Sequence, residues 1–142
     1  LNLAHPVSAQ HHYSLLTREI ENDVLEVTRR FGLGVIPYYP LESGFLTGKY
    51  RPATTPAGAR LSSGPRAEKV LSDQNFERLE KLEQFATGRG HTLLQLALGW
   101  LLSKPEVATV IAGASSGEQV RKNVEASGWR LDAAELAEVD AI

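Results

Sequence analysis

Blocks of apolar residues alternate with polar stretches along the chain in the order expected for strands and helices. Residues 7–12 predict a short strand, and residues 33–38 ("LGVIPY") predict a second strand that is apolar on both faces, as in a parallel sheet covered by helices. Pro37 lacks the backbone donor that a strand interior needs. Between the strands, residues 21–32 predict a helix that ends at Gly32. The face of this helix that we expect to pack holds Val24, Leu25, Thr28 and Phe31.

The polar middle of the chain separates these elements from a helical region. Residues 51–71 are rich in Pro, Gly, Ser and Ala and predict a long surface loop. Residues 72–90 then predict an amphipathic helix with Ser72 as its N-cap. The buried stripe of this helix is expected to contain Phe76, Leu79, Leu82, Phe85 and Ala86.

The last third of the chain predicts a helix, a strand and two further helices. Residues 92–104 predict an apolar helix that a proline ends, and residues 107–113 ("VATVIAG") predict a third strand. Residues 115–128 predict the next helix. The final helix is expected to begin with a capping box formed by Asp132 and Glu135.

The resulting order, βαβααβαα, predicts an α/β fold with a parallel sheet and helices packed outside it. No linker divides the chain, so we expect residues 1–142 to form a single domain. Three strands are few, because a closed eight-stranded barrel needs about 250 residues. We therefore expect part of a larger α/β unit. The absence of methionine, even at position 1, also leads us to expect an upstream segment.

Composition excludes several classes of protein. The formal net charge of −2 argues against nucleic-acid binding, which needs a clustered basic excess. No apolar stretch approaches the roughly 20 residues of a membrane span, and the N-terminus lacks the pattern of a signal peptide. The absence of cysteine excludes disulfides, thiolate metal ligands and cysteine nucleophiles. These features predict a cytoplasmic protein that binds neither nucleic acid nor membranes.

Candidate chemistry gathers at the ends of two predicted strands, where α/β proteins bind ligands. The first strand end is "YYPLESGFLTGKY", residues 38–50. Gly44 and Gly48 let the backbone approach a ligand closely, and Lys49 can supply charge to a phosphate. The alternative is an ordinary loop whose two leading tyrosines simply pack.

The second strand end is "VIAGASSGEQVRKN", residues 110–123. Ser115 or Ser116 caps the next helix, whose free N–H groups and positive dipole end favour a phosphate. The polar tips of Gln119 and Asn123 on its first turns are available to a cofactor. The alternative is a plain capping box of Ser116 with Gln119.

Together, the two sites resemble those of the aldo-keto reductases, a family of NADP-dependent (β/α)8-barrel oxidoreductases. Residues 9–50 resemble the family's sixth strand, sixth helix and seventh strand, and residues 93–126 resemble its seventh helix, eighth strand and cofactor-binding helix. The most similar branch includes bacterial general-stress-type reductases and potassium-channel β-subunits. The resemblance implies the C-terminal portion of a (β/α)8 TIM barrel, about strands 6–8 with their helices, which is incomplete as a lone chain.

The resemblance also implies roles for individual residues in binding NADP(H). Gln10 would hydrogen-bond the nicotinamide carboxamide, and Tyr38 would stack on the nicotinamide ring. The pyrophosphate would be lined by the backbone of Pro40, Leu41, Glu42, Ser43 and Gly44, with charge from Lys49. The adenosine 2′-phosphate and adenine would be held by Gly113, Ser115, Gln119 and Asn123. Arg60, in the predicted loop, would fold over the cofactor.

Two positions depart from the family pattern. Tyr39 stands where a serine is usual, and Lys122 stands where many relatives carry a glutamate beside the adenine. Because a lysine favours a 2′-phosphate, we expect NADP rather than NAD.

No catalytic residue is assigned to the chain. The resemblance implies that the family's catalytic tyrosine, lysine, aspartate and histidine belong to the first half of the barrel. His11 and His12 are adjacent on a strand and face opposite sides, and we expect the histidines to be surface or packing residues. The carboxylates show no metal-ligand spacing. Glu19, Glu21 and Asp23 are interpreted as partners of a helix dipole.

Two functions fit these features. The first is the C-terminal cofactor-binding part of an NADP-dependent aldo-keto reductase, in which hydride passes between NADPH and an aldehyde or ketone. The second is a non-catalytic NADP(H)-binding or regulatory module that completes a barrel with another chain. In either case the exposed sheet edge predicts self-association or pairing with an N-terminal partner segment.

Overall fold

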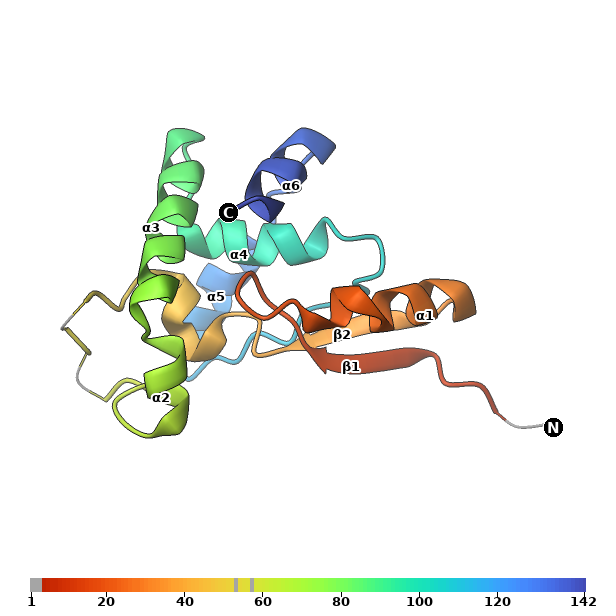
Figure 1. Ribbon diagram of the computed structural model, residues 1–142, viewed down its shortest axis with the longest axis horizontal. Helices are drawn as coiled ribbons and strands as arrows, with labels where there is room; N and C mark the ends of the chain where they lie inside the picture. The colour runs from red at the N-terminus through yellow and green to blue at the C-terminus, as the bar shows by residue number, and fades with distance from the viewer. Residues whose placement is uncertain (1–3, 53, 57) are drawn as a thin grey trace.

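The computed structural model describes residues 4–52, 54–56 and 58–142. Short 3₁₀ turns cover Glu19–Asn22 and Glu42–Thr47. The strands and α-helices are β1 (Ser8–His12), α1 (Val24–Phe31), β2 (Gly34–Tyr38), α2 (Pro65–Val70), α3 (Asp73–Gly88), α4 (Leu93–Leu102), α5 (Gly117–Ala126) and α6 (Ala133–Asp140). Figure 1 shows the two strands along the lower side of the molecule, with α1 directly above them and α4 and α6 higher still.

The sheet confirms the first two predicted strands and their parallel order. β1 and β2 pair from Ser8 opposite Gly34 to His12 opposite Tyr38, and α1 makes the connection between them. β1 is the outer strand of this two-stranded sheet within the described residues. Both carboxyl ends therefore lie at one edge of the sheet, next to the loop that follows Tyr38.

α1 ends where the sequence predicts. Gly32 adopts a left-handed φ of 66°, and its N–H donates back to the last turn of the helix. Leu25 and Thr28 are buried beneath the helix. Phe31, on the same predicted face, is 61% exposed and does not join them.

The third predicted strand, residues 107–113, is wrong as a regular strand. A single parallel bridge joins Val107 to Val35 of β2. The next step of a parallel ladder would need an N–H on Pro37, which has none. Instead the N–H of Ile111 donates to the carbonyl of Pro37 at 3.2 Å, whereas a regular ladder would use residue 110. The segment follows β2, but Pro37 prevents a continuous ladder.

The prediction of a continuous loop over residues 51–71 is also wrong, because the segment contains α2. Pro65 lies in the first turn of this helix, where a missing N–H costs nothing. Gly64 precedes it with a φ of 92°. Ala67 and Val70 are buried in the core and hold the helix against the rest of the protein.

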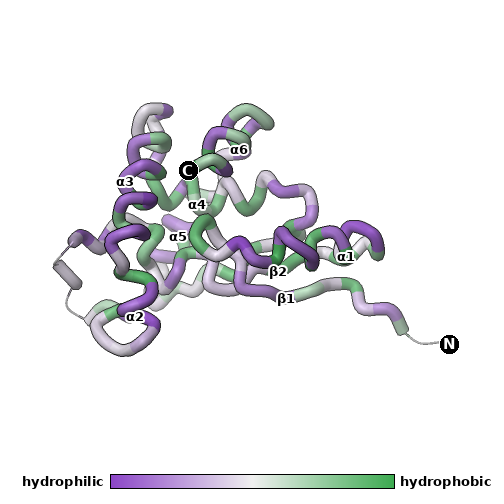
Figure 2. Tube along the Cα trace, in the orientation of Figure 1, coloured by the Kyte–Doolittle hydropathy of each residue, from purple (hydrophilic) through white to green (hydrophobic). Residues whose placement is uncertain are grey.

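α4 forms the centre of the hydrophobic core and packs against α3, α5 and the second 3₁₀ turn. Figure 2 shows hydrophilic and hydrophobic positions alternating along α3. As predicted, α3 buries Leu79, Leu82, Phe85 and Ala86, with Phe76 partly buried beside them. The fully buried residues of α4 are Leu96, Ala97, Trp100 and Leu101.

Local capping rules locate the starts of these helices. The hydroxyl of Ser72 accepts from Asn75 N–H at 3.4 Å and caps α3, and Asp132 and Glu135 form the predicted capping box of α6. A further capping box, which was not predicted, starts α4. It is formed by Thr92 and Gln95.

Candidate functional site

A cavity of about 660 Å³ opens at the carboxyl end of β2, between the loop that follows this strand and the segment that leads into α5. The loop lines it with Tyr38, Tyr39, Pro40, Leu41, Ser43, Gly44, Thr47 and Lys49. The rest of the lining is Gly58, Arg60, Leu94, Ile111, Gly113, Ser115, Gln119, Lys122 and Asn123. Because parallel α/β proteins bind ligands at this end of their strands, the cavity is the candidate site.

The predicted cofactor residues meet at this cavity, with two exceptions. Gln10 is exposed on β1, opposite Ile36, and lies outside the lining. Glu42 is 2% exposed and is also outside it. Arg60, predicted to fold over a cofactor, does line the cavity and approaches the backbone at Gly113.

The loop after β2 has an unusual backbone. Tyr39, Glu42 and Ser43 have φ values of 53°, 45° and 57°, in the left-handed region that non-glycine residues rarely occupy. Gly44 follows with a φ of 92°, and a Cβ built there would lie 3.0 Å from Nζ of Lys49. Glycine at position 44 therefore permits both the turn and the close passage of the lysine.

Glu42 turns its side chain into the protein rather than into the cavity. Its Oε1 accepts hydrogen bonds from the hydroxyl of Ser14 at 2.6 Å and from the hydroxyl of Thr17 at 2.8 Å. Nε2 of His12 lies 2.7 Å from the same oxygen. A buried carboxylate is costly unless it is hydrogen-bonded, and these partners satisfy it. The carboxylate thereby fastens the loop to the segment that follows β1.

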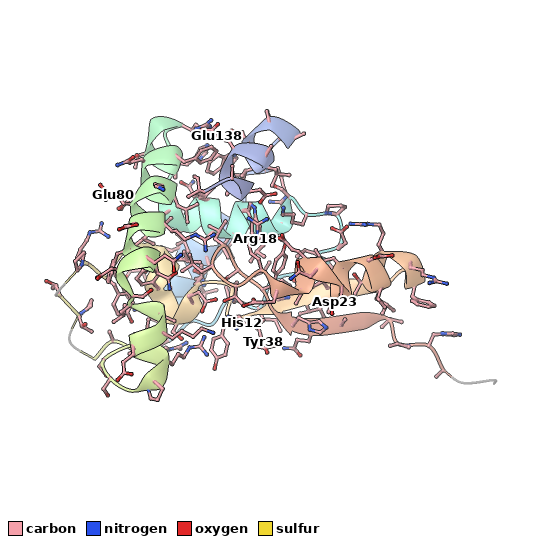
Figure 3. The ribbon with its side chains drawn as sticks, viewed as in Figure 1. His12, Arg18, Asp23, Tyr38, Glu80 and Glu138 are labelled. Atoms are coloured by element: carbon pink, nitrogen blue, oxygen red, sulfur yellow. The ribbon has the colours of Figure 1, made fainter. Side chains whose placement is uncertain are left out.

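His12 is a packing residue, as expected of the histidines, and it also contacts the buried carboxylate of Glu42. Its ring stacks on Tyr38, with centroids 5.5 Å apart and an interplanar angle of 21°, and meets Tyr39 edge-on at 5.6 Å. Figure 3 shows His12 and Tyr38 side by side where the two strands end. Their register, His12 opposite Tyr38, makes this contact possible. The contact with Glu42 joins residues 30 positions apart, and no local sequence signal indicates it.

The N-terminus of α5 is closed by its own side chains. The hydroxyl of Ser116 accepts from the N–H of Gln119 at 3.2 Å, as in the predicted capping box. On the other arm, Oε1 of Gln119 accepts from the N–H of Ser115 at 2.8 Å and from its hydroxyl at 3.1 Å. Gln119 therefore bonds the N–H of Ser115, one residue before the N–H of Ser116 that a regular capping box would use. Ser115 and Gln119 would exchange these bonds to contact a ligand.

The charged side chains among the described lining residues are all basic: Lys49, Arg60 and Lys122. Nζ of Lys122 lies 2.7 Å from Oε1 of Glu118 one turn earlier. This hydrogen bond and the charge of Glu118 raise the pKa of Lys122, so its ammonium group is fully charged at neutral pH. The lining therefore favours an anion, and phosphate groups fit this chemistry.

Two further observations concern only the described residues. No three His, Asp or Glu side chains there are placed to bind a metal ion together. No helix of that part of the chain combines the length and the apolar character of a membrane span.

These features define an α/β protein with parallel strands, a helical crossover and a basic cavity at the carboxyl end of a strand. The sequence model described as "Aldo/keto reductase family" matches residues 2–142. The chain belongs to the aldo/keto reductase family.

The chain spans less than half the length of the curated relatives that it matches, although each match covers most of this chain. A probable aldo-keto reductase 1 from Glycine max is 33% identical over 136 residues, which are 95% of this chain and 39% of the relative. A probable voltage-gated potassium channel subunit beta from Oryza sativa subsp. japonica is 35% identical over 130 residues, 89% of this chain and 40% of the relative. L-glyceraldehyde 3-phosphate reductase from Escherichia coli (strain K12) is 34% identical over 134 residues, 90% of this chain and 39% of the relative.

Proposed function

We propose that this chain is the cofactor-binding part of an NADP-dependent reductase that acts on aldehydes or ketones. In this proposal β1, β2 and residues 107–113 are strands 6–8 of a (β/α)8 barrel, and α1, α4 and α5 are helices of that barrel. Membership of the aldo/keto reductase family supports the barrel. The parallel pairing of β1 with β2, and of β2 with Val107, is compatible with it.

The observation that carries the proposal is the basic cavity. NADPH has a pyrophosphate and a 2′-phosphate, and the cavity sets Lys49, Arg60 and Lys122 around about 660 Å³ of space. An ammonium or guanidinium group forms charge-assisted hydrogen bonds with phosphate. A neutral substrate alone would not require three basic side chains in one lining.

In this proposal, the nicotinamide and the adenosine of the cofactor would bind at opposite ends of the cavity. Tyr38, which is 38% exposed, would stack on the nicotinamide ring. The backbone of residues 40–44 would contact the pyrophosphate, with charge from Lys49. At the far end, Asn123 and Lys122 would contact the adenosine and its 2′-phosphate, together with Gly113, Ser115 and Gln119.

The role of Gln10 at the nicotinamide carboxamide remains a prediction, because Gln10 lies outside the lining of the cavity. Its strand is adjacent to that of Tyr38, and Gln10 lies two residues before the end of β1. The backbone of Glu42, rather than its buried side chain, would contribute to the pyrophosphate site.

When bound, NADPH supplies hydride to the carbonyl carbon of an aldehyde or ketone. This chain would hold the cofactor and exclude water from one side of it. The groups that bind the substrate and protonate its oxygen would come from the remainder of the barrel, on the same or another chain. We expect the cytoplasm as the site of action, since a chain without cysteine fits a reducing compartment.

Calorimetric titration of the natural-length protein with NADPH and NADH tests the proposal. We expect NADPH to bind at least about tenfold more tightly, because only it carries the 2′-phosphate. Lys122→Ala is expected to reduce this preference to about threefold or less. Lys81→Ala, on the exposed face of α3 outside the cavity, is the matched control. Equal affinities for the two cofactors, or no binding of either, would contradict the proposal.

A separate assay tests the chemistry. If the protein is a reductase, NADPH absorbance will decline when a small aldehyde is added, and the rate will depend on the aldehyde concentration. Tight NADPH binding without any carbonyl-dependent oxidation would favour the non-catalytic module instead.

A further inference from the structure

Arg66 of α2 contacts the loop that lines the cavity at three points. Its guanidinium carbon lies 3.8 Å above the ring centroid of Tyr39. Its Nε donates to the hydroxyl of Ser43 at 3.1 Å, and its Nη2 donates to Oε2 of Glu42 at 3.5 Å. One side chain therefore joins three loop residues that span five positions.

The three residues that Arg66 contacts are the same three that have strained backbone. In the described part of the chain, Tyr39, Glu42 and Ser43 are the non-glycine residues with positive φ. Such residues persist only where the surrounding structure holds them in place. Arg66 provides contacts to all three, and it lies outside the lining of the cavity.

We propose that Arg66 is a positioning residue, which holds residues 39–43 in the conformation that shapes the dinucleotide cavity. The identity of the ligand as a dinucleotide rests on the proposed function, whereas the effect of Arg66 on the loop does not. The guanidinium acts on the cofactor through the loop, because Tyr39 and Ser43 line the cavity and Arg66 does not.

Arginine suits this role because its planar group stacks on a ring and donates hydrogen bonds from its edge at the same time. A lysine can supply the charge but not both contacts. The positive charge also lies beside the buried carboxylate of Glu42, whose other oxygen is held by His12, Ser14 and Thr17.

The helix that carries Arg66 is itself anchored. Its neighbours Ala67 and Val70 are buried. Upstream, Leu61 is 1% exposed, and its N–H donates to the hydroxyl of Tyr50 at 3.3 Å. The guanidinium is therefore presented to the loop from a fixed support, as a positioning role requires.

Hydrogen exchange of the unliganded protein gives the first test, and it needs no cofactor. The reporters are the amides of Glu42, Gly44 and Leu46, which donate within the loop to Tyr39 O at 3.0 Å and to Leu41 O at 2.8 and 3.2 Å. We expect Arg66→Ala to accelerate their exchange by about tenfold. Arg30→Ala, an exposed arginine on α1, is the matched control and should leave these amides unchanged.

Cofactor affinity gives the second test, with a rescue that distinguishes geometry from charge. Arg66→Ala should weaken NADPH binding by about tenfold, and Arg66→Lys should recover less than half of this loss on a logarithmic scale. Adding Ser43→Asn to Arg66→Ala should restore about threefold, because asparagine adopts positive φ more readily than serine. Circular dichroism checks that each variant is folded, and Arg66→Met, which removes the guanidinium but keeps a long unbranched side chain, replaces Arg66→Ala if the latter unfolds.

The outcomes separate this inference from the proposed function. Unchanged exchange at the three loop amides would overturn the positioning role, whatever the cofactor does. A loss of affinity that Ser43→Asn does not reduce would also overturn it, because Arg66 would then act through its charge alone. Failure of the unaltered protein to bind NADPH would overturn the proposed function and leave the exchange result standing.

Discussion

The indole N–H of Trp100 donates to the carboxylate of Asp140 at 2.8 Å, which joins the central helix α4 to the last turn of α6. Nζ of Lys104 reaches the second carboxylate oxygen at 2.8 Å, and Nη2 of Arg18 lies 3.1 Å from the first. Arg18 is labelled near the middle of Figure 3. One carboxylate thus connects the C-terminal helix to Trp100 in α4, to Lys104 just after α4 and to Arg18 in the segment that follows β1.

This arrangement predicts that the protein loses stability in acid, partly because Asp140 becomes protonated. Burial raises the pKa of Asp140, but the hydrogen bonds from Lys104 and Trp100 and the nearby positive charges outweigh it, so the pKa is lowered. The stabilisation is therefore complete above the unfolded pKa near 3.9 and is lost as pH falls through the lower folded value. Urea unfolding between pH 7 and pH 2 would measure it.

Asp140→Asn isolates the contribution of that charge. We expect the free energy of unfolding at pH 7 to fall by about 1–2 kcal/mol, because the carboxylate is 30% exposed and partly screened. The difference from the unaltered protein should shrink below about pH 3. Glu80→Gln on the outward face of α3, labelled in Figure 3, is the control and should change stability by less than about 0.5 kcal/mol. A constant difference at all pH values would contradict the assignment.

Tyr13 predicts the opposite dependence, in alkaline solution. Its phenol is fully buried and donates to Glu21 at 2.6 Å. Burial and the bond to Glu21 raise its pKa above the ordinary value of 10.0. This stabilisation is present below about pH 10 and is lost as pH rises further, because only the unfolded phenol ionises there.

Tyr13→Phe tests this dependence. At pH 7 the variant should lose about 1 kcal/mol of unfolding free energy with the hydrogen bond. Above pH 10 its stability should decline less steeply than that of the unaltered protein, by about 1.4 kcal/mol per pH unit. Equal slopes in denaturant titrations from pH 9 to pH 11 would rule out this role for Tyr13.

Two helical glycines should respond differently to alanine. A Cβ at Gly99 in α4 would lie 2.7 Å from the carbonyl oxygen of Trp129, which is backbone and cannot easily move. Gly99→Ala is therefore expected to destabilise the protein by about 1–3 kcal/mol. Gly88→Ala at the end of α3 meets nothing within 4 Å and should be neutral or stabilising by up to about 1 kcal/mol. Thermal unfolding of both variants measures the contrast.

Gly44→Ala should damage the cavity more than the fold. Its φ of 92° is strained for alanine, and the new methyl group would meet Lys49 Nζ at 3.0 Å. We expect NADPH affinity to fall by about tenfold or more, with Gly58→Ala as a second lining glycine for comparison. Gly58 also has positive φ, 68°, but has no atom within 4 Å of its Cβ position. Equal losses in the two variants would show that displacement of Lys49 is unimportant.

Features that depend on neighbouring residues could be predicted from the sequence. Ser72, the box of Asp132 with Glu135, and Gly32 are each recognised by residues within one turn of a helix. The strand order and the meeting of two strand ends also follow from the alternation of elements. The members of the cavity came from the family resemblance, and most of them do lie together.

Features that depend on distant contacts could not be predicted from the sequence. Glu42 is held by residues 25 to 30 positions earlier, and no periodicity in the chain relates them. α2 was hidden by the composition of its surroundings and by its length of six residues. Such a short helix is marginal on its own whatever its helix propensity, and burial of Ala67 and Val70 stabilises it. Arg66 could be recognised only once that helix was in place.

The missing backbone N–H of Pro37 affects which side chains line the binding site. Because the backbone beyond Val107 slips by one residue, the residue brought opposite Tyr38 is Ile111 rather than Val110. A shift of one position exchanges the two faces of an extended segment. Ile111, which is 48% exposed, accordingly joins Tyr38 in the wall of the cavity. The identity of a side chain that a ligand would meet is thus decided by an imino acid in the neighbouring strand.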